Sequence, residues 1–159
     1  MIVGIDPGVR GGAALLTERG AVVETIAFKG LKEKELACAF RAWDLRDPLN
    51  PPTVWIEKVG YIRGDGAMGS FTFGSIYGLL RGIVLAQGWE PHYVYPQLWQ
   101  SAMGCMTGGN KNVSKGKAIA LFPEYHAERK RGITHDVADA LLIAEYGRRA
   151  ELRSAPSCR

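Results

Sequence analysis

Long hydrophobic runs and paired cysteines are both missing from this sequence of 159 residues. No stretch of about 18 apolar residues is free of charge, so we expect no membrane span. The three cysteines, Cys38, Cys105 and Cys158, are too far apart to form a CxxC pair. Neither a disulfide framework nor a zinc site is therefore expected. The opening residues, MIVGID, include no basic leader or cleavage site, so we expect no signal peptide and a cytoplasmic protein.

A strong excess of one charge is also missing, because 20 lysines and arginines face 16 acids and the net charge is only +4. The basic residues are nevertheless unevenly placed. Residues 108–117 contain three lysines and no acid, and residues 129–135 contain four basic side chains and no acid. These runs permit a polyanionic partner without requiring one, because each also suits an ordinary solvated surface.

The pattern of apolar residues and turns predicts a single α/β domain. Strands are predicted at 2–5, 11–16, 22–28, 53–59 and 90–95. Helices are predicted at 32–43, 70–87, 96–103, 114–122 and 134–150. Short glycine turns between the first three strands favour an antiparallel meander, whereas helical crossovers suit parallel neighbours for the last two. We therefore expect a mixed five-stranded sheet flanked by helices over residues 1–150, and a flexible basic tail at 151–159.

The helix predicted at 70–87 contains three glycines that are four residues apart, Gly74, Gly78 and Gly82. A glycine inside a helix costs roughly 1 kcal/mol relative to alanine. Such a row makes sense if another backbone packs closely along that face, within the chain or across a dimer.

Two acids lie where predicted neighbouring strands end. Asp6 ends the first strand, before Pro7, and Glu57 lies near the end of the fourth strand, inside WIEKV. Parallel neighbours lie about 5 Å apart, so both carboxylates are expected at the carboxyl edge of the sheet, the usual ligand site of open α/β sheets. Each acid alone has a plainer explanation, since Asp6 suits a turn and Glu57 suits an exposed edge strand.

Two more acids share one face of the last predicted helix. In THDVADALLIA, residues 134–144, Asp136 and Asp139 are three apart and project from the same side. A negative charge near a helix start is mildly favourable, which accounts for Asp136. Asp139 is flanked by core-type residues, where solvent alone is a poor explanation. We therefore expect both carboxylates to face something positive.

Together these four carboxylates can meet at one edge of the sheet. Anions at short range repel each other, and divalent cations relieve that repulsion. Oxygen ligands without a cluster of histidine or cysteine suit Mg²⁺ or Mn²⁺. Two such ions, about 3.5–4 Å apart, can clamp the attacking and leaving oxygens of a phosphodiester. The acids therefore predict a two-metal site for phosphodiester hydrolysis.

In their order along the chain, these motifs resemble the RuvC-type Holliday-junction resolvases of the RNase H-like superfamily. The resemblance rests on GIDPG, then WIEKV, then DVADALLIA, and covers nearly the whole chain. MGSFTFGSIYGLLRG, VYPQLWQSAMG and NKNVSKGKAIALFP are especially similar to the phage and prophage branch. The resemblance implies an RNase H-like fold and a phage- or prophage-encoded homodimer. It also implies cleavage of four-way DNA junctions with two Mg²⁺ ions per active site, for which Mn²⁺ can substitute.

Roles for individual residues follow from the same resemblance. The metal ligands of the family correspond to Asp6, Glu57, Asp136 and Asp139. The lysine near its active site corresponds best to Lys115, with two other lysines close by. The expected DNA contacts are Lys58, Tyr61, Arg63, Lys111, Lys115 and Lys117.

Two positions depart from the family pattern. The loop after Glu57, KVGYIRGDGAMG, differs from the cellular resolvases, in which an aromatic residue there helps to open the junction. Tyr61 is the candidate for that role, and packing on its own loop is the plainer alternative. His135 lies beside the metal position, and it is either a helix-start residue or a group behind the metal ligands.

Other functions stay open at this point. A nuclease of the same fold that acts in DNA packaging or debranching would use the same acids and differ only in substrate. A non-catalytic DNA-binding module would be expected to lack a carboxylate, and all four are present. GIDPGVRGGAAL is also similar to the phosphate loop of sugar kinases and actin-like ATPases, but 159 residues are too few for their two domains.

Overall fold

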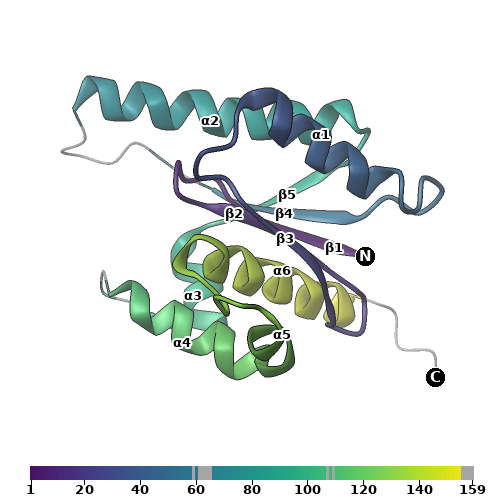
Figure 1. The fold of residues 1–159 in the computed structure, drawn as a ribbon, viewed down its shortest axis with the longest axis vertical. Coiled ribbons are helices and arrows are strands. Elements are labelled where there is room, and N and C mark those ends of the chain that lie inside the picture. Colours follow the sequence, from purple (N-terminus) through teal and green to yellow (C-terminus); the bar gives the residue numbers. More distant parts are fainter. Residues whose placement is uncertain (59, 61–65, 107, 109, 155–159) are drawn as a thin grey trace.

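A computed structural model describes residues 1–58, 60, 66–106, 108 and 110–154 (Figure 1). Its strands are β1 (Ile2–Asp6), β2 (Gly12–Leu16), β3 (Val22–Ala27), β4 (Thr53–Glu57) and β5 (Pro91–Val94). Its helices are α1 (Glu33–Asp44), α2 (Ala67–Ala86), α3 (Pro96–Met103), α4 (Lys111–Leu121), α5 (Pro123–Glu128) and α6 (His135–Ser154).

The strands form one mixed sheet in the order β3-β2-β1-β4-β5. β1 pairs antiparallel with β2 and parallel with β4, and β4 pairs parallel with β5. The predicted antiparallel meander followed by parallel strands is therefore confirmed. β1 lies at the centre of the sheet, so the residues that follow its end stand in the middle of the carboxyl edge.

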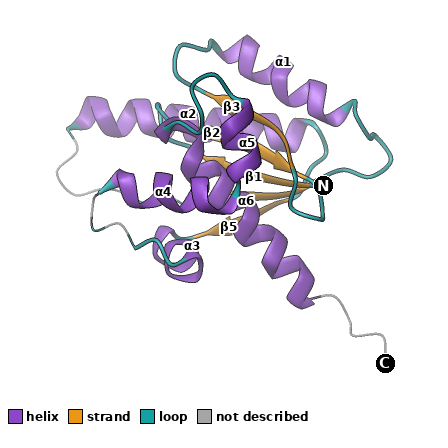
Figure 2. Ribbon diagram, turned by 60° about the horizontal axis from the view of Figure 1, so that its bottom comes forward, coloured by secondary structure: helices purple, strands orange, loops and turns teal. Residues whose placement is uncertain are grey.

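Helices cover the two faces of the sheet unequally. α1 and α2 lie on one face, and α3 to α6 lie on the other (Figure 1). Figure 2, turned so that the second face comes forward, shows α4, α5 and α6 in front of the strands. The first face buries a cluster that includes Phe40, Trp43 and Trp89, and the second buries one that includes Trp99 and Leu141. Alternate strand residues supply both clusters, which is why the central strands β1 and β2 are almost wholly buried.

Several element boundaries differ from the sequence prediction. α4 begins at Lys111 instead of residue 114, because the Asn110 side chain accepts a hydrogen bond from the Asn112 backbone N–H and caps the helix. α5 was not predicted, and it begins with Pro123 at the first helical position, where proline is well tolerated. α6 continues to Ser154, four residues into the segment expected to be a tail. Residues 155–159 of that tail lie outside the described residues.

α2 packs only one side on the rest of the protein, through Leu80, Ile83 and Val84. By length and composition it is the described helix that could cross a membrane, with a mean hydropathy of 1.2 and 17% of the tested window buried. One such helix is weak evidence for a span. Nothing lies within 4 Å of the position where a Cβ would stand on Gly74, Gly78 or Gly82. The close backbone contact expected at these glycines is therefore not made within the described part of the chain.

Candidate active site

The ends of β1 and β4 bring the first two acids together. Ile5 is paired with Ile56 in the parallel register, so Asp6 and Glu57 follow side by side at the carboxyl edge. Asp6 also accepts a hydrogen bond from the Gly8 backbone N–H at 3.1 Å, so it closes the turn as well as facing the edge. The turn explanation and the site explanation of Asp6 therefore hold at the same time.

Two glycines allow the start of α6 to lie directly on the sheet. A Cβ on Gly4 of β1 would collide with the backbone of Ala140 and Ala144, and one on Gly12 of β2 would collide with the backbone oxygen of Asp136. Because both positions lack a side chain, α6 approaches the strands closely and its first turns reach the edge where β1 ends. Asp136 and Asp139 are thereby placed over the ends of the strands.

Asp139 has one carboxylate oxygen with a hydrogen-bond partner and one without. The hydroxyl of Ser114 in α4, itself 3% exposed, donates a hydrogen bond to the Asp139 carboxylate. The other carboxylate oxygen, Oδ1, is buried and has no hydrogen-bond partner among the described residues. A buried carboxylate oxygen without a partner is costly in a folded protein. The arrangement therefore leaves room for an additional positive or hydrogen-donating group at this oxygen.

Glu57 is oriented by a tryptophan. The indole Nε1 of the fully buried Trp99 in α3 donates to Glu57 Oε2 at 2.7 Å. Trp99 and Ser114 were both missed in the sequence analysis. Trp99 reads as an ordinary apolar helix residue and Ser114 as an ordinary helix residue, and only their packing against α6 and the sheet reveals the contacts. No sequence signal distinguishes them.

Burial and mutual repulsion raise the pKa of three of these carboxyls. Loss of solvent, followed by the nearby charge of Asp139, raises the pKa of Asp6 to about 6. Loss of solvent, followed by the charge of Asp6, raises the pKa of Glu57 to about 7. Burial also raises the pKa of Asp139, against the hydrogen bond from Ser114. Three acids with raised pKa values at one edge of a sheet are typical of a functional site.

An open pocket of about 460 Å³ lies over these acids. Its lining residues are Asp6, Arg10, Lys111, Asn112, His135 and Asp136. His135 is the first residue of α6 and is exposed at the rim, so it combines the helix-start position with a place in the pocket wall. The structure thus brings all four predicted acids to one place, two in the pocket wall and two behind it.

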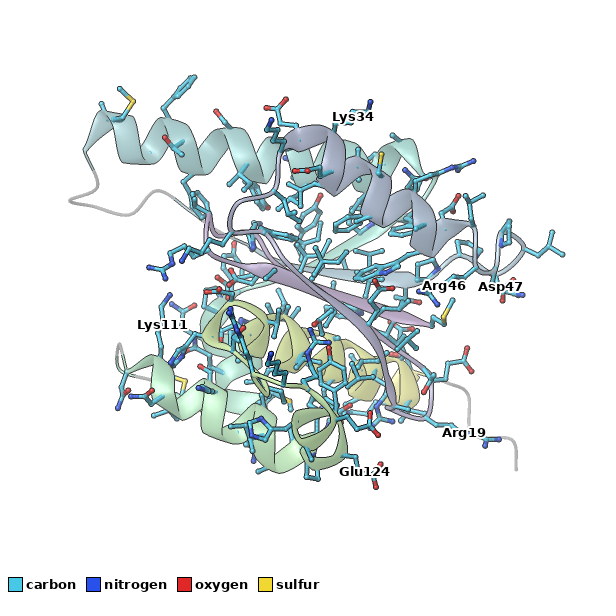
Figure 3. The ribbon with its side chains drawn as sticks, viewed as in Figure 1. Arg19, Lys34, Arg46, Asp47, Lys111 and Glu124 are labelled. Carbon is cyan, nitrogen blue, oxygen red and sulfur yellow. The ribbon has the colours of Figure 1, made fainter. Side chains whose placement is uncertain are left out.

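One lysine, Lys111, faces the acids. Its positive charge lowers the pKa of Asp6, Glu57 and Asp139 against the effect of burial. Figure 3 shows its side chain rising from the start of α4 towards the sheet edge. Lys115 lies one turn further along α4 and does not line the pocket. The geometry therefore favours Lys111 over Lys115 as the lysine of the site.

Of the remaining predicted DNA contacts, Lys58 and Lys117 are within the described residues. Lys58 is exposed and follows Glu57 directly. Lys117 lies near Cys105, whose pKa it lowers against the effect of burial. Tyr61 and Arg63 lie outside the described residues.

The acids suit a hard divalent cation by donor type, but no formed metal site is present. No three His, Cys, Asp or Glu side chains within the described ranges stand close enough together to hold a metal ion. The unpartnered Oδ1 of Asp139 and the raised pKa values of its neighbours nevertheless show a deficit of positive charge. An all-oxygen donor set with that deficit is what Mg²⁺ and Mn²⁺ prefer. The residues therefore fit such ions by the chemistry of their donor atoms.

The mixed sheet with its last helix laid across β1 is an RNase H-like fold, as the sequence resemblance predicts. Within that fold, the chain is similar to Thermus thermophilus RuvC in complex with a Holliday junction substrate. The TM-score is 0.62 and the identity 17%, over 96% of each chain. A second structure of Thermus thermophilus RuvC gives a TM-score of 0.58 at 18% identity, over 96% of this chain and 97% of that one.

A viral resolvase has a similar fold. The Fowlpox virus resolvase, in complex with substrate Holliday junction DNA, gives a TM-score of 0.57 at 15% identity, over 94% of this chain and 99% of that one. No family model matches the sequence, and no curated protein matches it. At these identities, the similarity establishes the fold.

Proposed function

We propose that this protein is a metal-dependent endonuclease that resolves four-way DNA junctions by paired cleavage of phosphodiester bonds. One observation carries the proposal: Asp6, Glu57, Asp136 and Asp139 gather beside Lys111 at the carboxyl edge of a fold shared with RuvC and a poxvirus resolvase. A phage or prophage origin rests on the sequence resemblance alone, and a cytoplasmic location rests on the three scattered cysteines.

Each residue of the site has a role in this proposal. The four carboxylates would hold two divalent cations, which when bound activate water and stabilise the leaving oxygen of a phosphodiester. Trp99 fixes the orientation of Glu57, and Ser114 fixes that of Asp139. Lys111 would bind a phosphate oxygen at the open pocket and offset its charge. Lys115 and Lys117, on the same helix, would contact the phosphate backbone further from the cut.

Cutting two strands symmetrically requires two active sites, which implies a homodimer. We assign the contact between the two subunits to the outer face of α2, because Phe71 is 74% exposed and Leu85 is 56% exposed there. The three glycines of α2 lie along this helix with open space above them. A second copy of α2 would supply the close backbone neighbour that the described part of the chain does not.

A panel of synthetic DNAs tests the proposal: a four-way junction, a fork, a flap and a linear duplex, each with Mg²⁺, Mn²⁺ or EDTA. We expect paired, symmetry-related nicks in the junction with either metal and none in EDTA. Linear duplex should be cut far more slowly. Asp6→Asn and Glu57→Gln should each abolish cutting while the fold is kept.

Glu124→Gln is the matched control, because Glu124 is exposed on α5 and labelled far from the edge in Figure 3. Full activity in EDTA would exclude the metal-dependent mechanism. Equal rates on linear duplex and on junctions would leave a general nuclease, acting for example in packaging or debranching. Binding of all the DNAs without cutting of any would indicate a non-catalytic binding module.

A further inference from the structure

The outer edge of the sheet carries two exposed tyrosines. β5 is the last strand in the sheet order, so its outer edge has no neighbouring strand among the described residues. Tyr93 is 38% exposed and Tyr95 is 50% exposed. Tyr93 lies in β5, and Tyr95 follows the end of the strand with its backbone still extended. Residues two apart in an extended segment share a side, whereas Val94 between them is buried on the other side. The tyrosines thus lie on the α2 side of the sheet.

An arginine from α2 lies against this pair. Arg81 Nε donates to the Tyr93 hydroxyl at 3.0 Å. The Arg81 guanidinium carbon lies 5.5 Å from the ring centroid of Tyr93 and 5.6 Å from that of Tyr77. The side chain is held in place but remains exposed, and it forms no ion pair with any described carboxylate. Its terminal nitrogens are therefore oriented and available to an anion.

Lys58 connects this group to the active site. The Lys58 backbone N–H donates to the Val94 oxygen at 2.7 Å, which extends the β4–β5 pairing one residue beyond Glu57. Its ammonium lies 4.9 Å from the ring centroid of Tyr95. Successive strand residues point to opposite faces, so the side chains of Lys58 and Glu57 project from opposite faces of the sheet at the end of β4. An extended ligand that crosses the end of β4 would therefore pass from Lys58 to Glu57.

The chemistry of this surface favours a nucleic acid strand. Exposed aromatic rings offer stacking faces, and the two cations among them carry no partner of opposite charge in the described part of the chain. Glu90, the acid nearest to the tyrosines in the sequence, lies before the start of β5. Glu57, next to Lys58, is turned to the other face of the sheet, where it accepts a hydrogen bond from Trp99. Bases stack on aromatic side chains with little regard to sequence, provided that they are unpaired. Unpaired bases beside a cut site occur where a duplex branches.

We propose that Lys58, Tyr77, Arg81, Tyr93 and Tyr95, here called the tyrosine–cation surface, bind an unpaired DNA strand that leaves the active site across the end of β4. This inference rests on the proposed nuclease function and adds the path of the DNA to it. Arg81 and Lys58 contact phosphates, and Tyr95 stacks on a base near the branch point.

Two variants and a matched control test the surface. Arg81→Gln removes the charge and keeps a hydrogen-bonding group, and Tyr95→Leu removes the stacking face and keeps apolar volume. Arg19→Gln is the control, because Arg19 is an exposed arginine at the opposite end of the molecule from Lys111 in Figure 3. Binding to a fluorescent four-way junction is measured by anisotropy in EDTA over a range of salt concentrations, and sedimentation reports the mass of each variant.

We expect Tyr95→Leu to weaken junction binding about tenfold, with a smaller effect on intact linear duplex. Arg81→Gln should lower the salt dependence of binding by about one counterion, which Arg19→Gln should not do. If the wild type binds and cuts junctions while both variants bind DNA as Arg19→Gln does, the proposed role of the tyrosine–cation surface is overturned. The proposed nuclease function is then retained. If either variant changes the sedimenting mass, the surface joins two copies of the chain and the inference is likewise overturned. A wild type that binds no DNA would overturn both proposals.

Discussion

At the scale of single residues, the acids of the site carry a deficit of positive charge. Asp6, Glu57 and Asp139 are pressed together, and burial is the first cause of each raised pKa. Lys111 opposes the shift at all three carboxyls but does not reverse it. Such a group of acids destabilises the fold when ionised, and a protein retains it where ligand binding or chemistry requires it.

The pKa shifts predict how the stability of the metal-free protein depends on pH. Folding raises the pKa of Asp6 from 3.8 to about 6 and that of Glu57 from 4.5 to about 7. The folded state therefore binds more protons than the unfolded state between these values. The contribution of both groups to the free energy of unfolding is fully present below about pH 4 and is lost as the pH rises through about 7.

Calorimetry in EDTA measures this contribution. From about pH 5 to about pH 8, wild-type protein should lose more stability than the double variant Asp6→Asn, Glu57→Gln, which lacks both ionisations. Mg²⁺ added at the higher pH should raise the melting temperature of the wild type and leave that of the variant unchanged. Parallel pH curves for the two proteins would contradict the assigned shifts.

Lys111 and Lys115 offer a comparison between two neighbouring lysines of one helix. Lys111 lines the pocket and acts on three carboxyls, whereas Lys115 lies a turn away. We expect Lys111→Ala to lower the cutting rate at saturating DNA by about 10²-fold, the scale of one lost electrostatic contact in a transition state. Lys115→Ala should mainly weaken binding. Single-turnover kinetics at several DNA concentrations separate the two effects, and the reverse pattern would restore Lys115 as the active-site lysine.

The ligand positions were predictable from sequence, and the groups that orient them were not. Asp6 and Glu57 end strands whose pairing follows from the order of elements, and Asp136 and Asp139 follow from helical spacing. The lysine depended on where α4 begins, and the cap from Asn110 moves that start to Lys111. Asn110 is a common helix-capping residue, but the two glycines before it favoured a loop at this position in the sequence.

At the scale of elements, α2 has two solvent-exposed sides that differ in chemistry. One side presents Tyr77 and Arg81 towards β5, and the outer side presents Phe71, Leu85 and the glycines. The helix and its row of glycines were both evident from the sequence. The backbone expected to pack closely against these glycines is not found within the described part of the chain. Whether a face is covered by the same chain or by another depends on tertiary packing, which helical periodicity does not contain.

Replacing a glycine of α2 separates the stability of the chain from its association. Gly78 has open space above it, so Gly78→Leu should raise the stability of the single chain, by about 1 kcal/mol from helix propensity. If α2 packs closely against a second copy, the same change should dissociate the dimer. Gly116→Leu in α4 is the matched control, since Gly116 is also a helix glycine with nothing within 4 Å.

Sedimentation and junction cutting give the readout for both leucine variants. We expect Gly78→Leu to sediment as a monomer and to lose paired nicking, whereas Gly116→Leu should keep the wild-type mass. A Gly78→Leu protein that remains dimeric would place the contact between subunits elsewhere.

At the scale of the whole molecule, the topology was predicted correctly while the layering was not foreseen. Short turns and helical crossovers determine which strands are neighbours, and these can be read from connection lengths. The grouping of α3 to α6 on one face, which encloses the acids with Trp99 and Ser114, depends on contacts between distant segments (Figure 1). The short helix α5 belongs to the same group and escaped prediction for the same reason.

The placement of α6 across β1 has a consequence for how the protein is made. Asp6 lies in β1, which leaves the ribosome well before α6, the helix that carries Asp136 and Asp139. Since Gly4 and Gly12 receive that helix directly, the sheet has an open face until α6 has been synthesised. If the protein is a nuclease, an incomplete nascent chain has no cutting centre. Fragments that end before α6 would then lack Asp136 and Asp139 and are expected not to cut DNA.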